Sequence, residues 1–414
     1  MKNIKLDTIL LFALVVPFIM MYRIGPGDTP IWLFGLIFLS LLSNVFLDIG
    51  VFKLKEKVYN RAKLFLLWFL VFATIGGGLF SEIIVRHQTA PIYHVNDIIL
   101  QQEAAIKFLV HGQNPYSVTY VNTPMAQFHY SDSEINPALY HFVMQPFYVL
   151  FAVPFYLVMG HTIGFFDARV PLFILFIILL VMAQFLQKDP EKKREFMTLL
   201  AFNPAMLGYF IEGRDDIFMY TFLFAAFYLL YKKKFSWAGF LMALAFTIKQ
   251  SVWPLFPFYV AFLYFSSKNI KKTIIWLIPF SILILAIIGP FFFWNPKAFL
   301  DSTIFYLSGN TTHSYPIAGY GLGMLLYQAG IIKNVHQQYP FTIWQIIICL
   351  PLLIGLIIWL GKKVSVVRLI LSYGIFLFVF WYLNRYFNNS HVGFLSMVFI
   401  TAYFWPNTSY DHAA

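Results

Sequence analysis

Charged residues are scarce in this chain of 414 residues, of which only 11% are Asp, Glu, Lys or Arg. Soluble domains carry about 25% charged residues. Outside 91–137 and 294–319 the sequence has no long polar stretch. The composition therefore excludes an ordinary soluble protein and leaves no room for a separate soluble domain.

Cysteine and the common cofactor motifs are also nearly absent. The one cysteine, Cys349, lies in an apolar run, which excludes an internal disulfide. The chain has no HExxH zinc motif, no Walker phosphate loop and no GxGxxG motif. We expect no cofactor, and nothing in the sequence indicates a divalent metal, although one is not excluded.

Apolar residues make up 60% of the chain. They recur in runs of about 20 residues, enough for a helix to cross about 30 Å of hydrocarbon, whereas a closed β-barrel would show short alternating segments. We therefore predict an all-α polytopic membrane protein with about twelve transmembrane helices, at 8–22, 30–50, 64–85, 168–187, 196–212, 216–231, 235–250, 251–267, 273–293, 342–360, 364–383 and 391–406.

The basic residues gather in short clusters between the apolar runs, at Lys2 and Lys5, 53–63, 188–194, 232–234, 268–272 and 362–368. This is the positive-inside pattern, so the net charge of +11 indicates a lipid bilayer as the partner and not nucleic acid. Placing every cluster in the cytoplasm predicts a multi-pass protein of the cell membrane with both termini inside. The first apolar run lacks a small-residue cleavage site, so we expect it to be retained as a span.

This topology requires that the apolar segment 138–160 does not cross the membrane. If it crossed, every later basic cluster would lie outside. The segment contains Pro146 and Pro154 and opens with the polar His141 and Gln145. We therefore expect it to lie in, or re-enter, the outer leaflet; the alternative is a thirteenth span.

The longest polar interruption, 91–137, is predicted on the outer face, within a loop at 86–167. Asp97 before 98–111, with Gly112 and Pro115 after it, predicts an amphipathic helix there. The chain then divides into two N-terminal spans at 1–63, a membrane core with the large outer loop at 64–293, and a second outer loop with the C-terminal spans at 294–414. Acidic residues gather towards the outer face, which places an active site on the extracytoplasmic side.

Three carboxylates are candidates for chemistry. Asp97 either caps the helix at 98–111 or acts on a substrate. The adjacent Asp215 and Asp216 are costly at a membrane boundary unless they are paired or functional. Either one of them caps the next span while Arg214 neutralises the other, or one binds a sugar or a metal.

Two isolated cations are candidates for binding an anion. Lys249 and Arg385 lie near the outer ends of apolar runs. Such side chains often only extend their charge to the interface. An intramembrane cation, here with the polar Gln250 beside Lys249, can instead hold an anionic head group, and Arg binds phosphate through two parallel hydrogen bonds.

Two further side chains are weaker candidates for substrate binding. His313 lies in the second outer loop and is either structural or part of the site. Tyr116 is one of several tyrosines in the first outer loop that are able to stack on a sugar.

Four stretches in this order resemble the C-type (GT-C fold) integral membrane glycosyltransferases, which use polyprenyl-phosphate sugars. They are Asp97 followed by a helix and GQNPY, then NPALYHFVMQPF, FNPAMLGYFIEGRDD and AGFLMALAFTIKQSVWPLFPF, together covering about 64–260. The chain departs from the family in having two spans before the usual first one.

The resemblance implies a transferase that moves a hexose or pentose, with mannose the best guess, from a polyprenyl-phosphate donor to a hydroxyl of a glycan, glycolipid or protein. It implies that Asp97 is the general base for that hydroxyl. Phosphate is already a good leaving group, so one carboxylate suffices, and Lys249 and Arg385 would stabilise the charge that grows on it. Direct displacement would invert the anomeric carbon.

Two other classes stay open. A flippase or transporter of lipid-linked sugars would need polar residues deep in several spans, whereas here they concentrate on one face. A non-catalytic assembly subunit would need no carboxylate at all.

Overall fold

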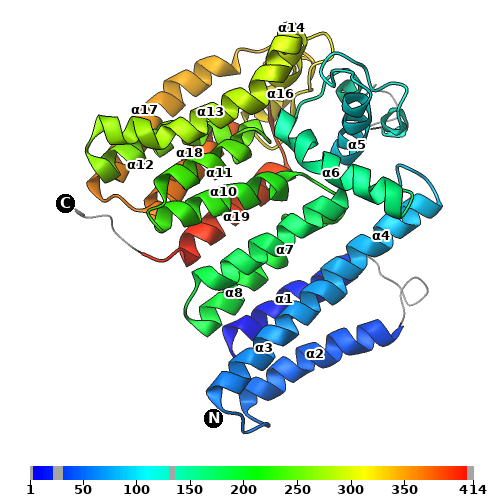
Figure 1. The fold of residues 1–414 in the computed structure, drawn as a ribbon, viewed down its shortest axis with the longest axis vertical. Helices are drawn as coiled ribbons and strands as arrows, with labels where there is room; N and C mark the ends of the chain where they lie inside the picture. The colour runs from blue at the N-terminus through cyan, green and yellow to red at the C-terminus, as the bar shows by residue number, and fades with distance from the viewer. Residues whose placement is uncertain (1–2, 22–30, 130–135, 408–414) are drawn as a thin grey trace.

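The computed structural model describes residues 3–21, 31–129 and 136–407, most of which lie in helices (Figure 1). In chain order the α-helices are α1 (Leu6–Met21), α2 (Ile31–Ile49), α3 (Glu56–Leu70), α4 (Gly77–Gln88), α5 (Asp97–Val110), α6 (Pro146–Thr162), α7 (Arg169–Leu186), α8 (Pro190–Ala201), α9 (Leu207–Ile211), α10 (Asp216–Tyr231), α11 (Phe235–Phe246), α12 (Phe256–Ser267), α13 (Ile270–Trp294), α14 (Pro296–Leu300), α15 (Tyr306–Ser308), α16 (Leu322–Gln328), α17 (Phe341–Lys362), α18 (Val366–Tyr382) and α19 (Asn389–Phe404).

Short turns of other helix types interrupt this order. Two are π-helical, η1 (Val71–Gly76) and η5 (Asp301–Phe305), and three are 3₁₀-helical, η2 (Pro124–Gln127), η3 (Pro137–Leu139) and η4 (Gln250–Leu255). Among the described residues the only strands are β1 (Ala318–Gly319) and β2 (Tyr386–Phe387), which pair in parallel. The expected all-α class is therefore confirmed.

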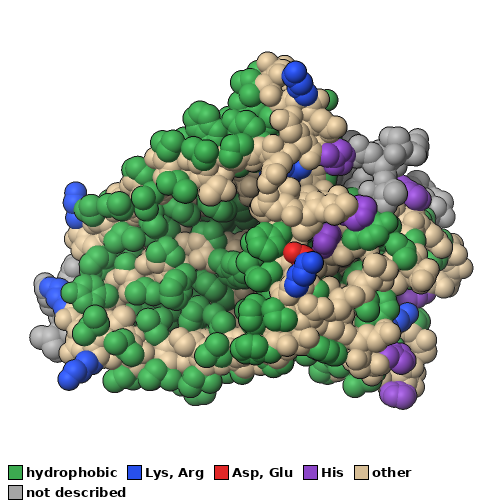
Figure 2. Space-filling model, turned by 90° about the horizontal axis from the view of Figure 1, so that it is seen from above, with side chains coloured by type: hydrophobic (Ala, Val, Ile, Leu, Met, Phe, Trp, Pro, Cys, Tyr) green, Lys and Arg blue, Asp and Glu red, His purple; other side chains and the backbone are tan. Residues whose placement is uncertain are grey.

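Among the described residues, five helical stretches are long and apolar enough to cross a membrane: Ile31–Ile49, Glu56–Gln88, Arg169–Leu186, Ile270–Trp294 and Phe341–Lys362. The second of these is α3, η1 and α4 joined end to end. Several shorter apolar helices pack beside them. Figure 2 shows hydrophobic side chains over most of one face, with basic side chains at its left margin and histidines towards its right. Such a surface is expected in lipid and supports the predicted membrane association.

A buried charge cluster joins four helices at one end of the bundle. Lys63 Nζ donates to Asp7 Oδ1 at 2.8 Å and to Asp48 Oδ1 at 2.7 Å, and Arg194 pairs with the second oxygen of Asp7. The start of α1, the end of α2 and the starts of α3 and α8 therefore meet there. Burying charges costs free energy unless each is paired, and here each one is paired.

Both ends of the described chain lie at this same end of the bundle. Lys5, just before α1, makes a 3.0 Å ion pair with Glu191 at the start of α8. At the end of α19, the ring of Phe404 stacks on that of Phe196 in α8, with centroids 5.0 Å apart.

Helices α5 and α6 lie at the opposite end, where α6 runs crosswise to α7 and α4 (Figure 1). The amphipathic helix predicted at 98–111 is α5, which begins one residue earlier and ends one residue earlier. The segment 138–160 is α-helical only from Pro146 onward. Before that helix lie the end of the turn η3 and a short stretch without regular secondary structure. In that stretch Gln145 N donates to Ile248 O at 3.0 Å, so the segment packs beside the end of α11.

Two predicted spans differ from the structure. The span at 196–212 is two helices, α8 and α9, because Asn203 and Pro204 interrupt it. The Asn203 side chain accepts a hydrogen bond from Ala205 N at 3.0 Å, which competes with the helix for that donor. The span at 251–267 begins with the 3₁₀ turn η4 and becomes α-helical only at Phe256.

Candidate functional site

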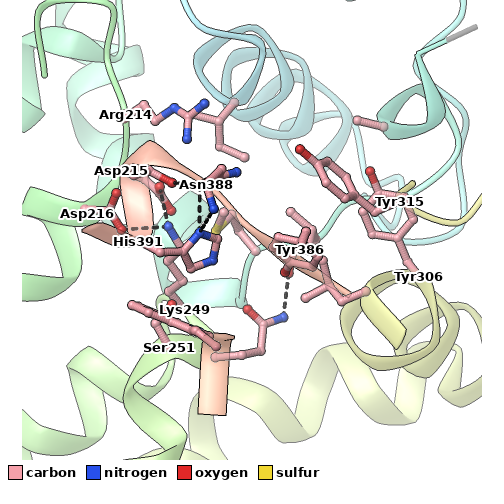
Figure 3. Close-up of a pocket in the computed structure, with 18 of the residues that line it drawn as sticks. Arg214, Asp215, Asp216, Lys249, Ser251, Tyr306, Tyr315, Tyr386, Asn388 and His391 are labelled. Carbon is pink, nitrogen blue, oxygen red and sulfur yellow. Dashed lines mark hydrogen bonds and ion pairs between the residues drawn. The ribbon is translucent and has the colours of Figure 1, made fainter. Parts of the chain in front are cut away.

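A cavity of about 250 Å³ opens at the end of the bundle opposite the buried charge cluster. Its walls come from the starts of α5, α10 and α19, the turn after α11, and the segment around α15 (Figure 3). Of the predicted site residues, Asp97, Asp215, Asp216, Lys249 and Gln250 line it. The structure thus brings together residues that are far apart in the sequence.

Lys249 holds the two adjacent carboxylates. Its Nζ donates to Asp215 Oδ1 at 2.9 Å and to Asp216 Oδ1 at 2.8 Å (Figure 3). Both aspartates are nearly fully buried, and the second oxygen of each has no hydrogen-bond partner among the described residues. Burial raises the pKa of Asp215, and the charge of Lys249 opposes that rise.

Arg214 does not make the ion pair that one interpretation of the sequence gave it, because Lys249 occupies that place. The guanidinium carbon of Arg214 instead lies 4.6 Å from the centre of the Tyr209 ring. Arg214 lines the cavity, and its buried Nε has no hydrogen-bond partner among the described residues. Burial lowers the pKa of the Arg214 guanidinium, but the negative charges of Asp216 and Asp97 more than offset this and raise it above its usual value.

Asp97 is the first residue of α5 and not its cap. The cap is Asn96, whose side chain accepts a hydrogen bond from Ile98 N at 3.3 Å. Asn96 therefore occupies the capping position, for which Asn is as good a residue as Asp. The interpretation of Asp97 as the cap is wrong. Asp97 lines the cavity together with Arg214.

Two backbone contacts fix the start of α5 against the start of α10. Asn96 N donates to Glu212 O at 2.7 Å. Arg169 Nη1 reaches both segments, at 3.1 Å from His94 O and 3.4 Å from Ile211 O. These bonds set the position of Asp97 relative to Asp215 and Asp216.

Gly213 makes this close approach possible. Its φ of +96° is a conformation that side-chain-bearing residues rarely adopt. A Cβ atom there would lie 2.3 Å from Ile99 Cγ1 and 2.9 Å from Arg169 Cγ. No side chain can therefore replace this glycine without moving α5 or Arg169.

Arg169 is itself held by a buried network at the same end of the molecule. Asp167 accepts hydrogen bonds from Arg169 Nη2 at 2.8 Å and from Arg86 Nη1 at 2.7 Å. Arg86 also binds both carboxylate oxygens of Glu103 on α5. Burial alone would raise the pKa of Asp167, but the hydrogen bonds from Arg169 and His87 hold it well below its usual range.

The wall facing Arg214 was not predicted from the sequence. It consists of Tyr306, Tyr315 and Tyr386, with Asn388 and His391 at the start of α19 (Figure 3). His391 Nδ1 and the Asn388 main chain and side chain form a capping box, which fixes the imidazole ring. The sequence signals available were three tyrosines in polar segments and a histidine at a span end, and neither pattern indicates which cavity they share.

The side chain of Gln250 connects two segments that line the cavity. Its side-chain amide donates to Val143 O at 2.7 Å and to Thr303 O at 3.0 Å. It therefore ties the segment before α6 to η5, and its remaining oxygen is the group that a substrate could meet.

Three predicted site residues lie outside the cavity lining. The guanidinium of Arg385 is buried and donates to the carbonyl oxygens of Tyr315, Gln337 and Val335. Tyr116 is buried, with its hydroxyl donating to Met144 O at 2.7 Å.

The ring of His313 stacks on that of Tyr140, with centroids 3.8 Å apart. Asp132, in the polar stretch 91–137, lies outside the described residues. Within the part of the chain that the structure describes, no three His, Cys, Asp or Glu side chains are placed to hold a metal ion.

Comparisons with known proteins assign no relative to this chain. No family model, no curated protein and no solved structure matches it. The argument for function therefore rests on the cavity and on the sequence motifs.

Proposed function

We propose that the protein is a membrane glycosyltransferase that moves a sugar from a polyprenyl-phosphate donor to an acceptor hydroxyl, with inversion, on the extracytoplasmic side of the cell membrane. The observation that carries the proposal is that Asp97 and Arg214 line one small cavity, which lies at the end of an apolar bundle. A transfer of this kind needs one proton acceptor and one cation for the phosphate.

The proposal includes a topology of twelve spans with both termini in the cytoplasm. The Lys63 cluster and the basic loops would lie on the cytoplasmic side, since positive residues favour that side. Helix α6 would rest in the outer leaflet, in agreement with its crosswise direction in Figure 1. The cavity would then open to the outer side.

In the proposed reaction, Asp97 accepts the proton of the acceptor hydroxyl as its oxygen attacks the anomeric carbon. The bond from that carbon to the phosphate oxygen breaks on the opposite face, and its electron pair leaves with the polyprenyl phosphate. One new glycosidic bond replaces one phosphoester bond, so no oxidant or cofactor is needed.

Arg214 is the residue we now assign to the donor phosphate. Lys249 is already shared between two carboxylates, and Arg385 is bound to backbone carbonyls. Arg214 has a buried nitrogen without a hydrogen-bond partner among the described residues. An unpaired guanidinium donor of this kind favours a phosphate ligand, which accepts two parallel hydrogen bonds.

Asp215 and Asp216 are assigned to the sugar. Each keeps one carboxylate oxygen without a partner in the described part of the chain, while Lys249 balances part of their charge. Carboxylate oxygens accept hydrogen bonds from sugar hydroxyls. Tyr306, Tyr315 and Tyr386 supply rings for the apolar face of the sugar.

The bilayer-facing surface is consistent with a lipid-linked donor. Figure 2 shows a hollow near the middle of the hydrophobic face. In the proposed reaction the polyprenyl chain of the donor stays in lipid, whereas a nucleotide sugar would have to enter from solution.

The direct test incubates the purified full chain with radiolabelled polyprenyl-phosphate mannose, glucose or arabinose and a membrane extract as acceptor. Transfer of label from one donor into a glycan, glycolipid or protein fraction is expected. Movement of an intact labelled donor across a vesicle membrane without transfer would instead identify a flippase. Neither transfer nor movement with any donor would contradict the proposal.

A further inference from the structure

We propose that the end of the bundle opposite the cavity carries a binding surface for the head groups of anionic phospholipids. Three connections between helices form this basic surface: 232–234 between α10 and α11, 268–272 between α12 and the first turn of α13, and 362–363 between α17 and α18. Its lysines are Lys232, Lys233, Lys234, Lys268, Lys271, Lys272, Lys362 and Lys363. None of them lines the cavity, so the surface is independent of the proposed transfer reaction.

Ring contacts place the three connections side by side at this end. The ring of Phe235, directly after the first connection, stacks on Trp276 in α13 with centroids 4.1 Å apart. Gly361, directly before the third connection, lies so close to the Phe265 ring of α12 that an added Cβ would come within 3.1 Å of it. The second connection joins α12 to α13 and therefore adjoins both others. Figure 2 shows basic side chains along one margin of the hydrophobic face, with no acidic side chain among them.

The stretch of chain that carries the basic surface is almost free of acidic residues. Between 217 and 410 the sequence has one, Asp301, which lies in η5 close to the cavity wall. All eight lysines of the surface are exposed. The connection before α8 differs, because Asp189, Glu191 and Glu195 lie among its basic residues. Positive charge that the surrounding chain does not balance attracts an anionic surface.

Two of the lysines stand where a helix usually places glycine. Lys233 follows the end of α10 and Lys268 the end of α12, and their φ angles are +57° and +48°. This left-handed conformation is unfavourable for a residue with a Cβ, and after a helix it is usually glycine that adopts it. The helix dipole favours a cation in the last turn, but a lysine elsewhere in that turn would gain as much without the unfavourable backbone. A role for the charge at these two positions accounts for them.

Aromatic side chains beside the connections place the lysines at the level of lipid head groups. Lys232 Nζ lies 5.3 Å and 5.2 Å from the ring centres of Tyr228 and Tyr231 in α10. Trp237 is 66% exposed and Tyr264 45% exposed, each within about one turn of a lysine of the surface. Tyr and Trp gather where the hydrocarbon of a bilayer meets its head groups. Helices α13 and α17 are long and apolar enough to cross the membrane, so the phosphates of lipids around them lie within reach of these ammonium groups.

The test reconstitutes the full chain in phosphatidylcholine vesicles with a trace of spin-labelled phosphatidylglycerol or, in a second sample, of spin-labelled phosphatidylcholine. Electron paramagnetic resonance separates lipid held at the protein from free lipid, and the ratio of the two held fractions is the selectivity for the anionic lipid. We expect a several-fold selectivity for phosphatidylglycerol in the wild type. Removing one lysine from each connection should bring the ratio close to one, in the combined variant Lys232→Gln, Lys268→Gln and Lys362→Gln.

The matched control removes the same charge from exposed positions between α2 and α3, beside the buried charge cluster, in the combined variant Lys53→Gln, Lys55→Gln and Lys57→Gln. This control should keep the selectivity of the wild type. Equal holding of both lipids by the wild type would overturn the proposal. An equal loss of selectivity in both variants would also overturn it, because total charge and not the basic surface would then attract the lipid.

Two further measurements keep the outcome specific. If the first variant does not fold, Lys234→Gln, Lys271→Gln and Lys363→Gln together test the same three connections. Sodium phosphate should lower the selectivity no more than sodium chloride of equal ionic strength, since both salts screen exposed charges alike. A greater loss in phosphate would overturn the assignment to lipid by identifying soluble phosphate as the ligand.

Discussion

At the scale of single residues, the position of Asn96 removes helix capping as a role for Asp97. A helix needs one capping side chain, and Asn96 supplies it for α5. Asp97→Asn should therefore leave the unfolding temperature nearly unchanged. It removes the proton acceptor, so sugar transfer should fall by roughly 10²–10⁴-fold, the usual contribution of a general base. The measurement is initial transfer rate beside thermal unfolding in detergent.

Asp189→Asn is the matched control for Asp97→Asn. Asp189 caps α8 through hydrogen bonds from Glu191 N and Lys192 N, at the opposite end of the molecule. This variant should transfer sugar at the wild-type rate. Full activity of Asp97→Asn, with activity lost in Asp215→Asn or Asp216→Asn, would move the base to that aspartate.

Substitutions of Arg214 and Arg385 distinguish a role in phosphate binding from a role in folding. Arg214→Gln should raise the KM for the donor by roughly tenfold to a hundredfold, because a hydrogen bond to a charged group contributes about 1.5–3 kcal/mol. Its unfolding temperature should change little, since the guanidinium packs on the ring of Tyr209, only five residues earlier in the chain.

Arg385→Gln should behave in the opposite way. Its buried guanidinium joins the end of α18 to three backbone carbonyls of the segment 315–337. Removing it should lower the unfolding temperature and leave the KM of the folded fraction unchanged. A donor KM raised by Arg385→Gln alone would return the phosphate site to the residue that the sequence first suggested.

At the scale of elements, the network around Asp167 joins α4, α5 and α7 beneath the cavity. Asp167→Asn leaves Arg86 and Arg169 buried with one carboxylate fewer. Breaking a buried ion pair in this way costs about 3–5 kcal/mol, which thermal or denaturant unfolding in detergent would measure. Glu191→Gln, which removes the partly exposed ion pair with Lys5, should change stability by about 1 kcal/mol or less.

The same carboxylate predicts a dependence on pH. The pKa of Asp167 is lower in the folded chain than in the unfolded chain. Its stabilising contribution is therefore complete above the unfolded pKa of about 3.9 and is lost as the pH falls towards the folded pKa. The wild-type protein should lose stability below about pH 4 more steeply than Asp167→Asn. Equal slopes for both proteins would show that other carboxylates govern acid unfolding.

Elements were predictable from the sequence where the signals are local. Helix α5 was predicted to within one residue at each end, because Asp97 at its start and Gly112 and Pro115 after its end lie next to it in the chain. The break between α8 and α9 was missed, because apolar periodicity continues across Asn203 and Pro204 and hides the local signal. The starts of η4 and α12 were missed for the same reason.

Only one wall of the candidate site could be predicted from the sequence. Asp97, Asp215, Asp216, Lys249 and Gln250 were found because polar residues in apolar runs stand out one at a time. The tyrosine wall and His391 depend on contacts between distant segments, such as that of Tyr315 with Tyr386, 71 residues later in the chain. No local pattern encodes such contacts. Arg385 stood out in the same way as Lys249, but its partners are backbone carbonyls, which a sequence does not mark.

At the scale of the whole molecule, the two ends differ in charge and in role. One end holds the ion cluster of Lys63 and both ends of the described chain, and the other holds the cavity. The long apolar helices run between these two ends. Which end faces the cytoplasm, and whether α6 crosses, are the two questions that decide the topology.

Single cysteines answer both questions in intact cells with an impermeant thiol reagent, since native Cys349 is buried. Lys192→Cys lies at the end with the ion cluster, and we expect it to be shielded. Gln113→Cys follows α5 and His161→Cys lies near the end of α6; both should be labelled, because a helix that rests in the outer leaflet keeps its two ends on one side. Labelling of Gln113→Cys with shielding of His161→Cys would mean that α6 crosses. In that case α7 and every later helix would run the other way through the membrane, and Lys192→Cys would be labelled as well.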